Sequence, residues 1–123
     1  MECILGGENK HEQWKTLKAG VDILIASPGR LIEFIKKKAT NLIRVTYLVL
    51  DEADRMLSLG FEQQIRSIVS QTRDDRQTLL FTATMKKSMQ LLVGDIVQYP
   101  LRITVGDQSA ANEDVKQEVV VIQ

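Results

Sequence analysis

Residues 45–54 read VTYLVLDEAD, and this stretch indicates the class of fold. Its first six residues are mostly aliphatic or β-branched and show little alternation, which is typical of a parallel strand covered on both faces. Two acidic residues, Asp51 and Glu52, follow directly at the carboxyl end of this strand. Ligands of α/β proteins bind at that end of the sheet. The stretch therefore predicts an α/β fold with a functional site at the end of this strand.

The rest of the chain alternates short apolar runs with helical patterns. Further strands are predicted at residues 3–5, 21–26, 78–81 and 101–105. Helices are predicted at residues 9–19, 27–38, 61–69 and 85–96. The first of these helices is a polar stretch that ends at Gly20, and the others carry apolar side chains three or four residues apart. Strands that alternate with helices form βαβ units, so the sequence predicts a mostly parallel sheet with helices on both faces.

The composition excludes several classes of protein. The 123 residues are 44% hydrophobic and 26% charged, close to an average soluble globular domain. A single cysteine, Cys3, excludes an intrachain disulfide and indicates an intracellular protein. No apolar run approaches the roughly 18 residues of a membrane span, so no membrane partner is predicted.

Positive charge is concentrated in the first third of the chain. Residues 1–45 carry eight Lys or Arg against five Asp or Glu, a balance of +3. If the protein contacts nucleic acid, the contact is therefore expected in this part of the sequence. The alternative interpretation of these lysines is a solvated helix face.

The acidic pair suits the hydrolysis of a nucleoside triphosphate. A carboxylate at the tip of a strand, here Asp51, can hold a hydrated Mg²⁺ ion that bridges two phosphates. The next carboxylate, Glu52, can orient the attacking water and remove its proton. The alternative is that these acids stabilise the N-terminus of a helix through its dipole.

Three other short segments also follow predicted strands. A GG pair at 6–7 suits a turn, SPGR at 27–30 suits an anion site at the start of a helix, and TAT at 82–84 supplies two hydroxyls. The alternative interpretation is a simple turn for the GG pair and helix capping for the other two segments. The residues of these segments are Gly6, Gly7, Ser27, Pro28, Gly29, Arg30, Thr82, Ala83 and Thr84.

The segments GG, SPGR, DEAD and TAT, in this order and each at a strand end, together resemble the first RecA-like domain of DEAD-box RNA helicases. The flanking stretches ASPGRLIEFI, YLVLDEADRMLSLGFEQQI and RQTLLFTATM are similar to the same family, and the resemblance covers residues 3–123. The run KKKATNL, the motif DEADRM and the stretch GDQSAANEDV look most like a splicing-associated eukaryotic subgroup.

The resemblance implies a fold and a division into domains. The fold is a RecA-like parallel sheet of the P-loop NTPase type, with helices on both faces, and it is incomplete. Residues 1–105 are expected to form the C-terminal half of the first helicase domain and residues 106–114 the linker to the second domain. Residues 115–123 are expected to form the first strand of that second domain.

The resemblance also implies an activity and its catalytic residues. The activity is RNA-stimulated hydrolysis of ATP coupled to local unwinding of RNA duplexes or to remodelling of ribonucleoproteins, with ATP and Mg²⁺ as cofactors. Asp51 is expected to coordinate Mg²⁺ through water, and Glu52 to act as general base. Asp54 is expected to bond to Thr82 and Thr84, and this DEAD–TAT contact is expected to couple nucleotide state to RNA remodelling.

The expected partners follow from the same resemblance. Residues of the GG and SPGR segments, including Arg30, are expected to contact the sugar–phosphate backbone of RNA without reading its sequence. The helix over 29–38 is expected to bend the bound strand. Further expected partners are the second RecA-like domain and ribonucleoprotein complexes, and the expected location is the nucleus.

Two residues depart from the family pattern, and one family motif is missing. Ser27 stands where threonine is commoner and Thr82 where serine is commoner, and both keep a hydroxyl. No G-x-x-x-x-G-K-[ST] phosphate-binding loop occurs in the 123 residues. The chain by itself is therefore expected to be inactive and marginally folded, with an unpaired apolar sheet edge.

Two alternative functions stay open at this point. One is a non-catalytic, truncated helicase paralogue that binds RNA or a protein. The other is a different Walker-type ATPase that shares only the strand with the acidic pair, and the SPGR and TAT segments argue against it.

Overall fold

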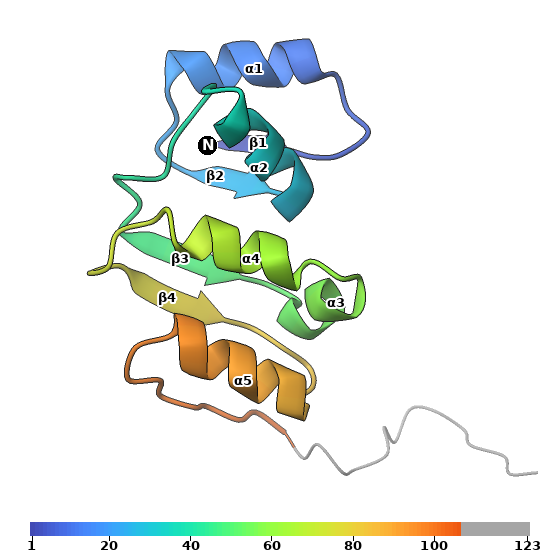
Figure 1. Cartoon of the computed structure of the whole chain (residues 1–123), viewed down its shortest axis with the longest axis vertical. Coiled ribbons are helices and arrows are strands. Elements are labelled where there is room, and N and C mark those ends of the chain that lie inside the picture. Colours follow the sequence, from blue (N-terminus) through green and yellow to red (C-terminus); the bar gives the residue numbers. More distant parts are fainter. Residues whose placement is uncertain (107–123) are drawn as a thin grey trace, which may run out of the picture.

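The computed structural model describes residues 1–106 of the chain. Strands and helices alternate along this part, as Figure 1 shows. In chain order they are β1 (Glu2–Ile4), α1 (Lys10–Ala19), β2 (Leu24–Ala26), α2 (Pro28–Lys36), β3 (Tyr47–Leu50), α3 (Ala53–Ser58), α4 (Glu62–Val69), β4 (Gln77–Leu80) and α5 (Lys87–Ile96). The linker predicted over 106–114 begins at the last described residue, and the strand predicted over 115–123 lies outside the described residues.

The described strands pair in parallel, β1 with β2 and β3 with β4. The registers align Ile4 with Ala26 and Leu50 with Leu80, so the paired strands end together. In Figure 1 the arrows of β2, β3 and β4 point the same way. The structure thus confirms an α/β fold with parallel strands, formed in the described residues as two small open sheets.

Local sequence explains where the first two helices begin and end. Asn9 precedes α1, and its side-chain oxygen accepts a hydrogen bond from the His11 N–H. Gly20 ends this helix with a φ of 95°, which only glycine adopts readily. Pro28 is the first residue of α2, where its fixed φ suits the helix and its missing N–H costs nothing. These boundaries agree with the predicted ones.

Two hydrophobic clusters hold the helices against the strands. The first contains Ile4, Leu17, Leu31, Phe34, Ala39, Leu42 and Ile68. The second contains Leu50, Ala53, Ile65, Val69, Met89, Leu92 and Ile96. Helix α4 contributes Ile68 to the first cluster and Ile65 and Val69 to the second. This helix therefore joins the two sheets into one packed unit.

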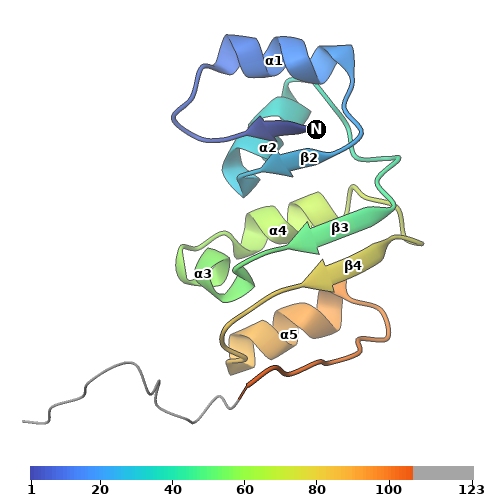
Figure 2. The same cartoon turned by 180° about the vertical axis from the view of Figure 1, so that it is seen from behind.

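Within the described residues, the sheets present one apolar face to solvent, so the helices predicted on both faces do not cover this one. Helices α2 and α4 lie on the other face, as the opposite views of Figures 1 and 2 show. On the uncovered face Ile25, Tyr47 and Val49 are 51%, 55% and 45% exposed. Side chains alternate between the faces of a strand, so their neighbours Leu48 and Leu50 enter the second cluster.

The strand predicted over 101–105 is wrong. The structure places no strand there, and Leu101, Ile103 and Val105 are 85%, 78% and 93% exposed. A strand requires a hydrogen-bonded neighbour, and an apolar run does not show whether one is present. Within residues 1–106, none of the helices has the length and apolar character needed to cross a membrane.

Candidate functional site

The segments that the sequence singles out follow the carboxyl ends of four strands. GG at 6–7 comes after β1, SPGR at 27–30 after β2, DEAD at 51–54 after β3 and TAT at 82–84 after β4. Because β2, β3 and β4 point the same way, these segments lie along one edge of the sheets (Figure 1). This edge is where open α/β sheets bind their ligands.

The acidic pair lies in a sharp turn between β3 and α3, and both Asp51 and Glu52 are exposed. Glu52 has a φ of 48° and a ψ of 45°, in the left-handed region, which costs a non-glycine residue about 1–2 kcal/mol. The turn lets Ala53 enter the core at 0% exposure, and the Ala53 N–H donates to the Phe81 carbonyl oxygen over 3.1 Å. It thereby leaves two carboxylates at the surface beside a strand end.

Helix capping does not account for Glu52. This residue occupies the N-cap position of α3, but its side chain makes no capping hydrogen bond. The carboxylate pairs with Arg55 Nη1 at 3.0 Å, and the Glu52 and Arg55 side chains are 65% and 72% exposed. A surface ion pair of this kind is worth about 0–1 kcal/mol. The Glu52 carboxylate is therefore easily released to another partner.

The donor set at this turn fits a hydrated Mg²⁺ ion. Mg²⁺ prefers oxygen ligands, keeps several waters and is usually bound through one or two carboxylates. Asp51 Oδ1 accepts one hydrogen bond, from the Glu52 N–H at 2.9 Å, and the carboxylate has further lone pairs. Residues 1–106 contain no cluster of three His, Cys, Asp or Glu side chains that could hold a metal ion directly.

Asp54 connects the acidic turn to the segment after β4. Asp54 Oδ2 accepts hydrogen bonds from the Thr84 hydroxyl at 2.8 Å and the Thr84 N–H at 3.0 Å. The Thr84 hydroxyl, more than any other group, lowers the pKa of Asp54 below its ordinary value of 3.8. The Thr82 hydroxyl has one proton and donates it to the Thr84 carbonyl oxygen at 2.8 Å. Of the two contacts predicted for Asp54, the Thr84 hydroxyl makes the stronger one, and the Thr82 hydroxyl also lowers the pKa of Asp54, to a smaller extent. Ala83 lies exposed between the threonines.

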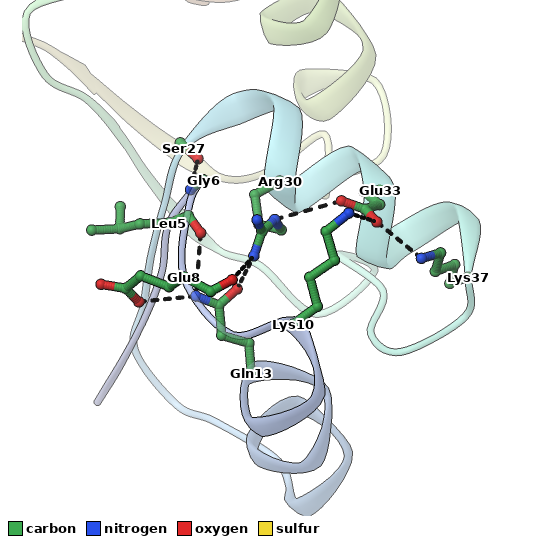
Figure 3. Close-up of polar contacts among 9 residues, drawn as sticks. All are labelled: Leu5, Gly6, Glu8, Lys10, Gln13, Ser27, Arg30, Glu33 and Lys37. Carbon is green, nitrogen blue, oxygen red and sulfur yellow. Dashed lines mark hydrogen bonds and ion pairs between the residues drawn. The ribbon is translucent and has the colours of Figure 1, made fainter.

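The loop after β1 and the start of α2 are joined directly. The Gly6 N–H donates to Ser27 Oγ at 3.3 Å, as Figure 3 shows. Gly7 has a φ of 88°, which glycine adopts without steric cost. Ser27 makes no side-chain cap to its own helix, and Gly29 in the first turn is exposed. Free N–H groups at a helix start, next to a glycine loop, suit the binding of a phosphate.

Arg30 does not extend toward solvent, which corrects its predicted contact with an RNA backbone. Arg30 is 8% exposed, and its Nη1 donates to Gln13 Oε1 at 2.6 Å and to the Glu8 carbonyl oxygen at 3.3 Å (Figure 3). Its Nε lies 3.5 Å from the Glu33 carboxylate. The charge is paired inside the protein, as a buried charge must be. The sequence pattern indicated the arginine of SPGR as a ligand group, whereas the structure buries its side chain among internal partners.

Gln13 and Glu33 were not singled out in the sequence, although both contact Arg30. Glu33 also pairs with Lys10 at 2.8 Å and Lys37 at 2.9 Å, and these lysines lower its pKa to about 2. The one sign of these contacts in the sequence is that Glu33 and Lys37 are four residues apart on a helix, a spacing that suits an ion pair. A glutamine within a polar stretch gives no sign that it is buried.

The sequence model of the DEAD/DEAH box helicase family matches residues 1–92, which is more than half of the chain. The chain belongs to the DEAD/DEAH box helicase family. DEAD-box ATP-dependent RNA helicase 24 of Arabidopsis thaliana is 56% identical over 122 residues, which cover 99% of this chain and 16% of that protein. ATP-dependent RNA helicase DDX42 of Homo sapiens is 54% identical over 120 residues, 98% of this chain and 13% of that protein.

A solved structure of this helicase family supports the fold. The crystal structure of the yeast DEAD-box splicing factor Prp28 matches with a TM-score of 0.80 and 36% sequence identity, over 89% of this chain and 26% of that chain. The predicted RecA-like α/β fold is thereby confirmed, as is the resemblance to DEAD-box helicases. The chain spans less than one fifth of the length of the curated helicases described above.

Proposed function

We propose that the whole protein is an ATP-dependent RNA helicase that couples RNA-stimulated hydrolysis of ATP to local unwinding of RNA duplexes or remodelling of ribonucleoproteins. The observation that carries this proposal is the shared strand edge, where the acidic turn and the glycine-rich segments follow strands that point the same way. Membership of the helicase family supports it. Because the chain covers 16% or less of the curated relatives compared, the activity is proposed for the whole protein.

The acidic turn is the proposed catalytic part of this site. Asp51 would hold Mg²⁺ through water, and the bound ion would supply positive charge against the phosphates of ATP. Glu52 orients the hydrolytic water and accepts its proton, the task of a general base. Its exposed carboxylate and weak pairing with Arg55 leave it available for this task.

The GG loop and the first turn of α2 are the proposed RNA-binding part. Gly6 and Gly7 lack side chains, so a phosphate can approach their backbone N–H groups closely. Ser27, Pro28 and Gly29 present the start of α2 beside this loop. Contacts of this kind reach sugars and phosphates and not base edges, so binding is independent of RNA sequence.

The contact between Asp54 and Thr84 is the proposed link between the two activities. It joins the turn that carries Glu52 to the segment after β4, across two hydrogen bonds. A shift of the acidic turn on hydrolysis is thus passed to the TAT segment, and the proposed outcome is release of the RNA strand.

The proposed partners extend beyond the described residues. In this proposal residues 1–105 belong to the first RecA-like domain, residues 106–114 form a linker, and residues 115–123 begin a second RecA-like domain that completes the site. Nuclear location and assembly into ribonucleoproteins are proposed because Prp28, a structural relative, is named a splicing factor.

Substitution of Glu52 in the full-length protein tests the proposed function. Glu52→Gln keeps the size of the side chain and removes the base, so the rate of ATP hydrolysis is expected to fall about 10²–10⁴-fold. ATP-dependent binding to a single-stranded RNA is expected to remain. The matched control is Glu12→Gln, which also removes an exposed carboxylate from a pair three residues apart.

Three outcomes of this experiment bear on the proposal. Loss of hydrolysis in Glu52→Gln alone supports it. Normal turnover in Glu52→Gln removes Glu52 from the mechanism. A wild-type full-length protein that binds RNA without RNA-stimulated hydrolysis contradicts the helicase assignment and favours the non-catalytic paralogue.

A further inference from the structure

A buried polar pair lies beneath the GG loop. Gln13 of α1 is 7% exposed and Arg30 of α2 is 8% exposed, and they are among the few buried polar residues of the described chain. Figure 3 shows both side chains directed at the loop that connects β1 to α1. Buried polar groups cost free energy unless they are hydrogen-bonded, so their partners indicate what they hold.

Gln13 and Arg30 together bond to both ends of this loop. The Gln13 side-chain amide donates to the Leu5 carbonyl oxygen at 3.2 Å and to Glu8 Oε2 at 3.0 Å. Arg30 Nη1 donates to the Glu8 carbonyl oxygen at 3.3 Å. Gly6 and Gly7 lie between these anchored residues. The loop thus has fixed ends and a glycine pair at its centre.

The pair is itself held in place. Gln13 Oε1 accepts a short, charge-assisted hydrogen bond of 2.6 Å from Arg30 Nη1. The Arg30 guanidinium lies 5.8 Å from the centre of the Phe34 ring, and Nε contacts Glu33 at 3.5 Å. Phe34 is 1% exposed, so the surface on which Arg30 rests belongs to the core. Neither side chain can turn outward without breaking several of these contacts.

The same loop is fixed from the side of α2. The Gly6 N–H donates to Ser27 Oγ, and Ser27 immediately precedes the helix that carries Arg30. The loop is therefore attached to α2 at two points, Ser27 on one side and the Gln13–Arg30 pair on the other. Loss of one attachment would let the glycine N–H groups move relative to the start of α2.

We propose that Gln13 is a positioning residue for the RNA site. Through its side-chain amide and Arg30 it holds the GG loop against the start of α2 without touching RNA. This inference rests on the proposed function, because it gives Gln13 a task in RNA binding by that same site. It predicts that the affinity for RNA depends on Gln13, a buried side chain of α1 that does not contact the RNA.

Two substitutions in the full-length protein separate this task from folding. Gln13→Ala removes both hydrogen bonds that the Gln13 side chain donates to the loop. Gln13→Glu keeps an oxygen to pair with Arg30, but it cannot donate to the Leu5 carbonyl oxygen and it repels Glu8. Thr16→Val is the control, since Thr16 lies on the same helix, carries no charge and bonds through its hydroxyl to the Glu12 carbonyl oxygen within that helix.

RNA-stimulated ATP hydrolysis is measured at increasing concentrations of a single-stranded RNA. Both Gln13 variants lose the two hydrogen bonds that the Gln13 amide donates to Leu5 and Glu8, so they are expected to raise the KM for RNA about tenfold and to keep kcat at saturating RNA within about twofold. Thermal unfolding is measured alongside. Gln13→Glu is expected to unfold near the wild-type temperature, so that its raised KM reflects the loop and not the fold.

The outcomes distinguish failure of this inference from failure of the proposed function. A KM for Gln13→Glu within about twofold of the Thr16→Val control overturns the positioning role, and so does a fall in kcat with an unchanged KM. Either result leaves the helicase assignment intact if the wild-type protein is stimulated by RNA. Absence of stimulation in wild type and control overturns the proposed function, and with it this inference.

Discussion

At Asp54 a single carboxylate binds both donors of Thr84, the residue at the far end of the TAT segment. The two residues are 30 positions apart in the sequence, so the contact exists only because β3 and β4 pair in parallel and end together. A hydrogen bond to a charged group is worth about 1.5–3 kcal/mol. This is enough to make the position of one segment depend on the other.

Thr84→Val in the full-length protein tests this dependence. Valine keeps the shape of threonine but loses the hydroxyl, so the pKa of Asp54 is expected to rise toward its ordinary value. RNA duplex molecules unwound per ATP hydrolysed are expected to fall about tenfold, because one of two linking bonds is lost. Thr16→Val, which removes a surface hydroxyl within α1, is the control. An unchanged ratio, or an equal loss of hydrolysis and unwinding, contradicts the coupling role.

Glu33 shows how neighbouring charges fix a residue beside the proposed RNA site. The hydrogen bond from Lys10 and then the one from Lys37 lower its pKa from 4.5 to about 2. Because the pKa is lower in the folded state, the stabilisation is complete above about pH 4.5 and is lost as the pH falls toward 2. Lys10 belongs to α1, so this stabilisation links α1 to α2.

Glu33→Gln is expected to make the chain less stable than wild type at pH 7, with a difference that shrinks below about pH 4.5. Urea unfolding of both proteins at pH 7, 5, 4 and 3 measures this difference. Glu12→Gln, which removes an exposed pair to Lys15 at 3.6 Å, serves as the control. A Glu33→Gln deficit that stays constant with pH would show that the charge of Glu33 is not what stabilises the fold.

At the scale of helices and strands, the sequence predicted what depends on local pattern. The apolar run before Asp51 is β3, and the stripe of Phe61, Ile65, Ile68 and Val69 marks α4, since these features lie within one element. The strand at 101–105 failed because pairing depends on a neighbour elsewhere. Helix α3 was foreseen only in the alternative interpretation of the acidic pair, because its six residues are too few to show a helical period.

The candidate site was also predicted in part: the positions of its segments were predicted, but the directions of its side chains were not. Motif order placed the GG, SPGR, DEAD and TAT segments at strand ends, and the structure brings these ends to one edge. The side-chain directions were not predictable from motif order. Arg30 was expected to face RNA, but Phe34 and Gln13 hold it inside. Burial depends on how α1 packs across α2, and no single element contains that information.

The whole molecule has a packed face and an uncovered one. Helix α4 joins the two hydrophobic clusters on the packed face. On the other face of the described residues, Ile25, Tyr47 and Val49 contact solvent over about half of their surface. Contiguous exposed apolar side chains on a sheet favour self-association. The 123-residue chain in isolation is therefore expected to associate through this face as its concentration rises.

Replacing Ile25 and Val49 together by Thr tests this expectation. Threonine keeps the β-branched shape that suits a strand, but a hydroxyl replaces the ethyl group of Ile25 and a methyl group of Val49, so the fold is retained while the apolar surface shrinks. Burying one such side chain is worth about 1.5–3 kcal/mol, so the concentration at which the chain associates is expected to rise at least about tenfold. Sedimentation velocity over a range of concentrations measures the concentration at which each chain associates.

Leu59→Thr, at a side chain 64% exposed beyond the end of α3, is the control and is expected to behave as wild type. Equal association of the double variant and wild type would show that this face does not drive it, and a double variant with lost helical signal would show that these side chains support the fold instead.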